Sequence, residues 1–260
     1  MASKGVLLLP PSKTKAAGGA SDPFGATLND DHPLTVARRQ VLSAAQAAAT
    51  GNDASIARIA GVRRTDVDTA RECLANLADA ATMPASQRYT GIVHGNAGLP
   101  AMHPSALAGR VFIVSALLGL VAADDPVPDY RLEFSASLPE IGGLATFWRK
   151  AARDCLASLV SGTIVWDLLP GEHARIWPSD RESIGDGNTR LVTFRFLNPT
   201  GRSANAARTK VAKGRLAAAL LQDLTISPAE LVKMADLGDG WTCEVASTGA
   251  HAEIIATCSL

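Results

Sequence analysis

Apolar runs of strand length alternate along this chain with stretches whose apolar residues recur at helical spacing. The first run, Gly5 to Leu9, is continuously apolar and is stopped by Pro10 and Pro11. A short run of this kind is typical of a buried central strand that ends in a loop. Later runs predict further strands at 110–118, 163–169, 191–197, 241–246 and 253–258.

The intervening segments predict helices at 36–48, 53–60, 65–81, 144–160 and 212–222. Residues 16–34 are rich in Gly, Ala, Ser, Asp and Pro, which predicts a mobile connection without regular structure. This order of elements fits the α/β class, and 260 residues suffice for one large domain. We therefore expect residues 1–260 to form a single mixed-sheet domain that carries a helical hairpin insert at about 36–81.

The charged residues are balanced overall and segregated locally. Lys plus Arg and Asp plus Glu both number 25, so the net charge gives the whole molecule no attraction to nucleic acid or to an anionic membrane. Any anion site must therefore be local. The segment between Asp186 and Asp223 contains no carboxylate and holds the cations Arg190, Arg195, Arg202, Arg208, Lys210, Lys213 and Arg215.

Cysteine and histidine spacing argues against a metal site. Cys73, Cys155, Cys243 and Cys258 form no C-x-x-C pair, and the histidines have no ligand spacing. The sequence predicts no metal centre and identifies no cofactor. Because no apolar run approaches membrane-spanning length and the N-terminal run is too short for a secretory signal, we expect a reduced, cytoplasmic protein without membrane contact.

A polar loop follows the first predicted strand. Ser12, Lys13 and Thr14 could offer backbone N–H groups, hydroxyls and an ammonium to a phosphate or carboxylate. The loop lacks the glycines of a Walker A motif. The alternative is a turn stiffened by proline whose lysines are simply solvated.

Arg131 and Glu133 lie two residues apart, so in an extended segment both point to one face while Tyr130 and Leu132 point to the other. The simpler interpretation of this pair is a structural ion pair. In the alternative, Arg131 is a clamp for an anion, and Glu133 orients it or acts as a general acid or base.

Lys210, Lys213 and Arg215 lead into the apolar positions of the last predicted helix. Cations at a helix start oppose the helix dipole, and a bound anion would compensate them. A solvent-facing basic helix is the alternative. The turn at Gly61 resembles half of a helix-hairpin-helix, which presents backbone N–H groups to DNA phosphates, although its second glycine is missing and a plain helical hairpin remains open.

Taken in order, these segments resemble the YaaA-type peroxide-stress protein family over nearly the whole chain. The motifs that carry the resemblance are Pro11-Ser12-Lys13-Thr14, Tyr89-Thr90-Gly91, Ser115 to Gly119 with Asp125, Tyr130-Arg131-Leu132-Glu133, Phe147-Trp148 and Lys210 to Gly214. The resemblance implies a cytosolic, single-domain α/β protein with a helix-hairpin-helix-like element, a basic cleft, DNA binding and a role in limiting iron-driven oxidative damage. It also implies a cleft lined by Lys13, Thr14, Tyr89, Arg131, Lys210 and Lys213.

Some positions depart from the family's pattern. Ala122 and Ala123 stand where the family usually has Arg-Pro, and the late element at 167–173 keeps Glu172 but has His173 in place of a tyrosine. An imidazole there could transfer protons near neutral pH.

Two hypotheses follow. In the first, the protein binds DNA or another phosphate-bearing ligand through Ser12, Lys13, Thr14, Tyr89, Arg131, Lys210, Lys213 and Arg215. In the second, it is a diverged biosynthetic enzyme that holds a small anionic or nucleotide-like substrate with these cations. Proton transfer in that enzyme would fall to Glu133, Glu172 or His173.

Overall fold

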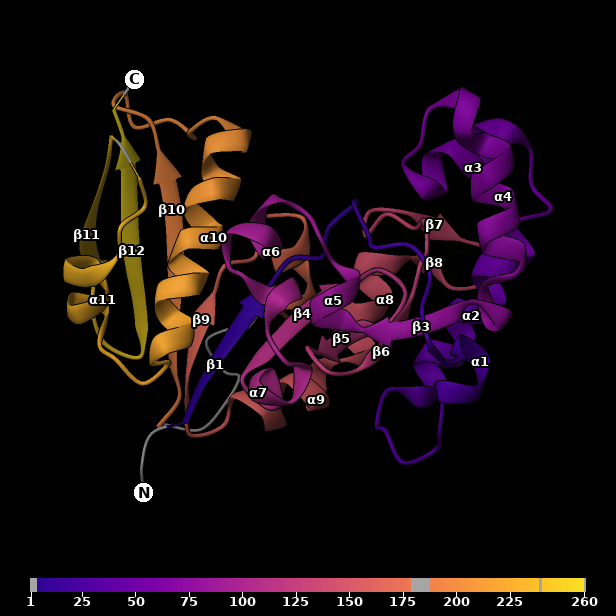
Figure 1. The fold of residues 1–260 in the computed structure, drawn as a ribbon, viewed down its shortest axis with the longest axis horizontal. Helices are drawn as coiled ribbons and strands as arrows, with labels where there is room; N and C mark the ends of the chain where they lie inside the picture. The colour runs from indigo at the N-terminus through magenta and orange to yellow at the C-terminus, as the bar shows by residue number, and fades with distance from the viewer. Residues whose placement is uncertain (1–3, 179–187, 239, 260) are drawn as a thin grey trace.

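A large mixed sheet forms the centre of the protein (Figure 1). The computed structural model describes residues 4–178, 188–238 and 240–259. Within these residues the sheet has seven strands in the order β11-β12-β10-β9-β1-β4-β5. The strands are β1 (Lys4–Leu9), β4 (Val111–Ser115), β5 (Gly119–Ala122), β9 (Thr163–Asp167), β10 (Arg190–Leu197), β11 (Trp241–Ser247) and β12 (His251–Cys258).

The inner strands β4, β1, β9, β10 and β12 are parallel, and the edge strands β5 and β11 are antiparallel to their neighbours. In β1, Leu7 pairs with Val111 of β4 and with Trp166 of β9. Every side chain from Val6 to Leu9 is fully buried. This confirms the predicted central strand, because a strand covered on both faces has no solvent-facing side to fill with polar residues.

The order in which the chain adds strands to the sheet reverses between β1 and β9. From β1 it proceeds to β4 on one side, and from β9 to β10 on the other. The loops that leave the carboxyl ends of β1 and β9 therefore diverge. In open α/β sheets a crevice forms at such a point, and ligands bind there.

The helices cover the sheet and extend beyond it. Figure 1 shows α10 lying across the β9–β10 part of the sheet, and α3 and α4 at the opposite end of the molecule from β11 and β12. The helices are α1 (Phe24–Thr27), α2 (Thr35–Ala48), α3 (Asp53–Ala60), α4 (Val67–Ala75), α5 (Ala85–Arg88), α6 (Ile92–Asn96), α7 (Pro104–Leu107), α8 (Leu144–Ala151), α9 (Arg153–Val160), α10 (Ala206–Gln222) and α11 (Pro228–Met234). Single 3-10 turns occur at Arg64–Asp66, Leu77–Asp79, Leu99–Ala101 and His173–Ile176.

Two small sheets complete the fold: β2 (Ser21–Pro23), β3 (Ala81–Pro84) and β6 (Pro126–Pro128) form one, and β7 (Ser137–Leu138) and β8 (Gly142–Gly143) the other. The prediction that 16–34 lacks regular structure is wrong, since it contains β2 and α1. The Thr82 hydroxyl donates to the Asp22 carbonyl at 2.8 Å, and the Phe24 side chain is fully buried. Long-range pairing and one aromatic anchor thus override a loop-like composition.

Other boundaries also differ from prediction. The helix expected over 144–160 is interrupted at Ala152, and the helix expected over 65–81 ends at Ala75, so that Ala81 instead opens β3. The last long helix begins at Ala206 rather than 212, because the Asn205 side chain accepts hydrogen bonds from the first turn. Among the described helices, none is both long and apolar enough to cross a bilayer.

Candidate functional site

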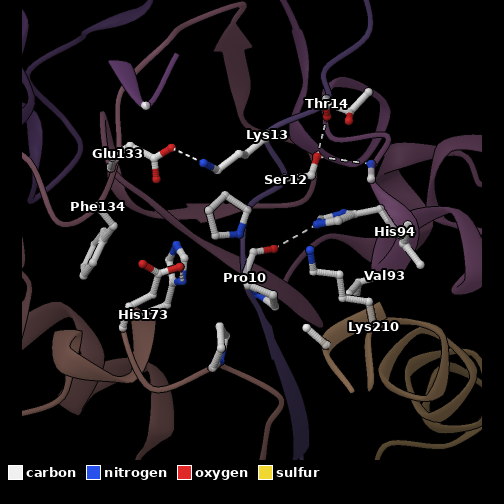
Figure 2. Close-up of a pocket in the computed structure, with 18 of the residues that line it drawn as sticks. Pro10, Ser12, Lys13, Thr14, Val93, His94, Glu133, Phe134, His173 and Lys210 are labelled. Atoms are coloured by element: carbon white, nitrogen blue, oxygen red, sulfur yellow. Dashed lines mark hydrogen bonds and ion pairs between the residues drawn. The ribbon is translucent and has the colours of Figure 1, made fainter. Parts of the chain in front are cut away.

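A pocket of about 680 Å³ opens at the carboxyl ends of the parallel strands (Figure 2). Its walls come from the loop after β1, the loop after β9 and the start of α10. The segment 130–134, the turn at Gly61 and helix α6 complete it. A volume of this size suits a small-molecule ligand or a single nucleotide.

Most of the predicted site residues lie together around this pocket. Those that line it are Ser12, Lys13, Thr14, Arg131, Glu133, Glu172, His173, Lys210 and Lys213. In Figure 2, Lys13 and Glu133 lie on one side of Pro10 and Lys210 lies on the other. Tyr89 and Arg215 are not part of the lining.

Tyr89 lies behind the pocket wall. Its side chain is fully buried, and its hydroxyl is 3.0 Å from that of Tyr130, which does line the pocket. The Tyr130 hydroxyl also bonds to Ser115 at 3.0 Å. Tyr89 therefore lies behind Tyr130 and is not among the described residues that line the pocket, where the family resemblance had placed it.

Arg215 points away from the pocket because it lies two residues beyond Lys213 in α10. Lys213 and Arg215 are both inside the helix, and two residues span more than half a helical turn. The Arg215 guanidinium is 3.9 Å from the Asp236 carboxylate, on the side of α11.

Arg131 and Glu133 do not pair with each other. The Glu133 carboxylate is 2.5 Å from the Lys13 ammonium, whereas Arg131 is 3.2 Å from the Asp129 carboxylate and donates to the Lys13 carbonyl at 3.4 Å. The simpler interpretation of the 131/133 pair as an internal ion pair is thus wrong. The alternation itself is confirmed, since Tyr130 and Leu132 are buried.

Ser12 closes a turn. Its hydroxyl donates to the Thr14 carbonyl and accepts from the Gly91 backbone N–H at 3.2 Å. A Cβ on Gly91 would lie 2.5 Å from the Cβ of Ser12, so this close approach requires glycine. Ser12 therefore shapes the loop that presents Lys13.

Helix α10 places Lys213 deep in the pocket. Lys213 donates to the Leu168 carbonyl at 2.7 Å, and burial lowers the pKa of its ammonium to about 8 despite the nearby Asp167 carboxylate. The helix lies close against α6, because a Cβ on Gly214 would be 2.4 Å from the Cβ of Asn96. This contact fixes the rotation of α10 and directs Lys210 and Lys213 to the pocket.

His173 is a neutral base beside that ammonium. Burial, with a smaller effect of Lys213, lowers the pKa of His173 to about 4. Its Nδ1 lies 3.4 Å from the Glu172 carboxylate, and its ring packs 5.2 Å from that of Phe134. At neutral pH the imidazole is unprotonated and could accept a proton.

Two pocket residues were missed by the sequence reasoning. Lys15 is half-buried, and its Nζ lies 4.2 Å from the centre of the Tyr130 ring. His94 is fully buried, and its Nε2 must donate to the Pro10 carbonyl, 2.8 Å away. Lys15 could have been predicted as a pocket residue, because it lies in the same loop as Lys13. Nothing in the sequence around His94 marked it.

Cations outnumber carboxylates around the pocket. Among the described lining residues the cations are Lys13, Lys15, Arg131, Lys210 and Lys213, and the carboxylates are Glu133 and Glu172. Both histidines of the lining have a pKa of about 4 and are neutral at pH 7. The arrangement can therefore attract an anion and offers groups that accept protons.

Comparison with known proteins shows the family of this chain. The sequence profile of the family described as peroxide stress protein YaaA matches residues 6–244. A UPF0246 protein of Streptomyces coelicolor is 29% identical over 255 residues, which cover 95% of each chain. A UPF0246 protein of Corynebacterium efficiens is 29% identical over 217 residues, 78% of this chain and 85% of its own. The family match spans the strands, the loops and the helix that build the pocket, and the chain belongs to the YaaA peroxide stress protein family.

Proposed function

We propose that the pocket is a basic cleft that binds a phosphate-bearing ligand, with DNA as the first candidate, and that this binding limits oxidative damage under peroxide stress. The observation that carries the proposal is the convergence of Lys13, Arg131, Lys210 and Lys213, from three distant segments, on one pocket. Cations gathered in a hollow with few carboxylates attract phosphate much more strongly than cations scattered over a surface.

The helical hairpin extends this surface beyond the pocket. Gly61 ends α3 in the left-handed conformation, with φ of 63°, and lines the pocket together with Val62. Arg58, Arg63 and Arg64 are exposed nearby in sequence. We infer that the turn acts as one half of a helix-hairpin-helix and contacts the sugar-phosphate backbone while the pocket holds one nucleotide.

Binding of fluorescein-labelled single-stranded and duplex oligonucleotides, followed by anisotropy at low salt, tests the proposal. Lys210→Glu reverses a charge in the pocket, and Lys233→Glu reverses an exposed charge on α11 outside it. We expect the first variant to lose most of the affinity and the second to retain it. Equal losses in both variants, or no binding by the unmodified protein, would refute the proposal.

A second candidate function is favoured by the pair of His173 and Lys213. A neutral imidazole beside a buried ammonium can remove a proton while the ammonium stabilises the negative charge that develops. The protein would then be an enzyme acting on a small anionic substrate. Glu133 and Glu172 are the other proton-transfer groups in the lining.

A ligand that co-purifies with the protein, identified by mass spectrometry, would provide the substrate for this test. His173→Gln and Glu133→Gln keep a polar side chain of similar size and remove its basicity. Loss of turnover with retained thermal stability would support the enzyme. Retained turnover in both variants would exclude these two groups as the base.

A further inference from the structure

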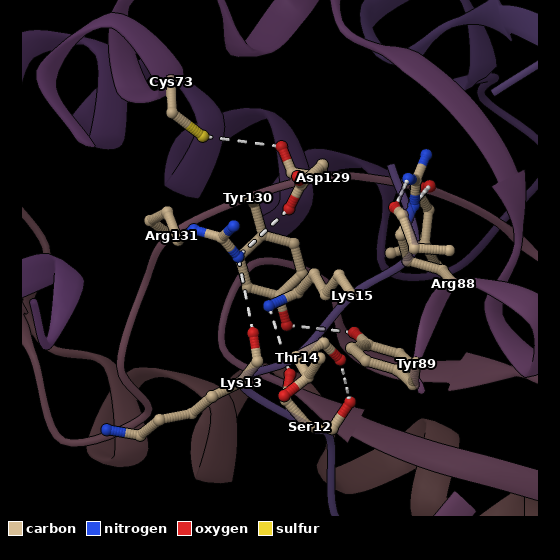
Figure 3. Close-up of polar contacts among 12 residues, drawn as sticks. Ser12, Lys13, Thr14, Lys15, Cys73, Arg88, Tyr89, Asp129, Tyr130 and Arg131 are labelled. Atoms are coloured by element: carbon tan, nitrogen blue, oxygen red, sulfur yellow. Dashed lines mark hydrogen bonds and ion pairs between the residues drawn. The ribbon is translucent and has the colours of Figure 1, made fainter. Parts of the chain in front are cut away.

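Lys15 occupies an unusual position in the pocket wall (Figure 3). Its ammonium donates to the Ser12 carbonyl at 3.2 Å and lies 4.2 Å from the ring centre of Tyr130 and 5.8 Å from that of Tyr89. The side chain lines the pocket, so a ligand there can reach it. No role in the phosphate-binding proposal requires this residue.

The backbone that carries Lys15 is held firmly. Lys15 forms a bridge with Tyr89, Thr90 donates to the Thr14 carbonyl at 3.2 Å, and Ala16 donates to the Arg88 carbonyl at 2.9 Å. The buried Arg88 guanidinium also donates to the carbonyls that follow, at Ala16 and Gly18. A reactive side chain needs a rigid backbone of this kind, because a loosely held side chain seldom reaches its target in the right geometry.

Two features that activate a lysine as a nucleophile are present together: removal from water and a neighbouring cation. Burial first, and then the Arg131 guanidinium, lower the pKa of Lys15 to about 8 against the smaller opposing effects of Asp129 and Glu133. At pH 7 the unprotonated fraction is then roughly 300-fold larger than for an ordinary lysine.

The nearby carboxylates are engaged with other cations. Asp129 lies 3.2 Å from Arg131, and Glu133 lies 2.5 Å from Lys13. Among the ion pairs between described residues, none includes Lys15. No direct counter-ion therefore holds the Lys15 amine in its charged form.

We propose that Lys15 is a nucleophilic amine that forms a reversible Schiff base with a phosphate-bearing aldehyde or ketone bound in the pocket. The inference rests on the proposed function, because the phosphate must be held before the carbonyl is attacked. The Nζ lone pair forms a bond to the carbonyl carbon, and the carbonyl oxygen takes up a proton. A second proton lets that hydroxyl leave as water, which gives the C=N bond, and the two protons given up by the amine balance the two taken up by the oxygen.

The other pocket lysines suit phosphate binding better. Lys213 donates to the Leu168 carbonyl at 2.7 Å beside the Asp167 carboxylate, which favours its ammonium form. The Lys13 side chain is 77% exposed and is paired with Glu133. These two residues would hold the phosphate while the Lys15 amine attacks the carbonyl carbon of the ligand.

Two sources share this ligand chemistry. One is a small phosphorylated aldehyde or ketone. The other is an abasic site in DNA, where the open deoxyribose is an aldehyde with a phosphate on each side. Reduction with borohydride converts either Schiff base into a stable secondary amine, so both sources can be tested by covalent trapping.

The experiment incubates the protein with pyridoxal 5′-phosphate in one arm and with an abasic-site duplex oligonucleotide in the other, and adds borohydride to each. Peptide mass spectrometry identifies the modified lysine. Lys15→Arg keeps the positive charge and removes the nucleophile, Lys15→Met removes both, and Lys233→Arg is the matched control on α11. Thermal melting verifies that each variant is folded.

We expect trapping mainly on Lys15 in at least one arm, a loss of roughly tenfold or more in Lys15→Arg, and unchanged trapping in Lys233→Arg. The arm that traps identifies the source. Trapping spread evenly over other lysines, or wild-type trapping in a folded Lys15→Arg, would overturn the inference. If the protein binds an intact oligonucleotide but is trapped in neither arm, the Schiff-base inference fails and the proposed function stands; if nothing binds, both fail.

Discussion

Gly61 and Glu133 are in such close contact that a Cβ on Gly61 would lie 1.9 Å from Oε1 of Glu133. The backbone N–H of Glu133 donates to the Ile59 carbonyl at 2.9 Å, so the end of α3 and the segment 130–134 are joined there. Glu133 in turn pairs with Lys13. The helical hairpin therefore positions the carboxylate that orients the lysine of the β1 loop.

Gly61→Ala should destabilise the protein more than an alanine substitution at another glycine with a similar positive φ. Gly98 also has a positive φ, of 73°, but a Cβ there meets no atom within 4 Å. We expect Gly98→Ala to lower the free energy of unfolding by about 1 kcal/mol and Gly61→Ala by about 2 kcal/mol or more. Urea denaturation of the two variants measures the difference. Equal losses would mean that Glu133 moves aside without cost.

Arg88 should be essential for stability. Its fully buried guanidinium donates to the carbonyls of Ala16, Gly18, Ala81 and Val127. Arg88→Met would leave these acceptors unsatisfied, and we expect a loss of about 4 kcal/mol in the free energy of unfolding.

Urea denaturation of Arg88→Met beside Arg63→Ala tests this expectation. Arg63 is exposed and, within the described part of the chain, its ion pair is with Asp66, so its removal should have no measurable effect on stability. A small loss in Arg88→Met would show that the loop after β1 does not depend on this residue.

Stability should fall as the pH is lowered from 7 to 4.5. His94 and His173 have a pKa of about 4 in the folded protein against an ordinary value of 6.5, mainly because of burial. In this window the unfolded chain binds more protons than the folded protein, so stability rises with pH, by up to about 3 kcal/mol for each histidine. Thermal melting against pH should show a shallower slope in His94→Gln. An unchanged slope would argue against a neutral, buried His94.

Ligand affinity should fall as the pH is raised from 7 to 9. Lys213 has a pKa of about 8, lowered first by burial, and only its protonated form attracts phosphate. Oligonucleotide titrations across this range at constant salt would measure the effect. A Lys213→Arg variant stays protonated and should lose part of the pH dependence. Constant affinity up to pH 9 would contradict direct contact between Lys213 and the phosphate.

Local sequence patterns predicted a strand or helix well where the signal lies within the segment itself. The apolar run Gly5 to Leu9 could only be a buried strand, and the helix at 53–60 has the predicted bounds, because Asn52 caps it and Gly61 ends it. The segment 16–34 was misjudged because β2 has only three residues, and its pairing with β3 cannot be inferred from its own composition.

The sequence predicted which residues belong to the candidate site better than it predicted which of them contact each other. The predicted members Lys13, Arg131 and Lys213 all line one pocket, although Lys213 lies inside α10 and not at its start. The partner of Glu133 could not be predicted, because Lys13 approaches it only through the tertiary fold. Arg215 was misplaced because it was grouped with Lys213 as a helix-start cation, whereas residues two apart in a helix point to different faces.

The salt dependence of oligonucleotide binding tests the convergence of these cations on one phosphate-bearing ligand most directly. Each lysine that neutralises a phosphate contributes about 1 to the slope of log affinity against log salt concentration. The account predicts that Lys13→Ala and Lys210→Ala each reduce the slope by about 1 and that Lys233→Ala leaves it unchanged. Slopes equal to that of the unmodified protein in both pocket variants would contradict it.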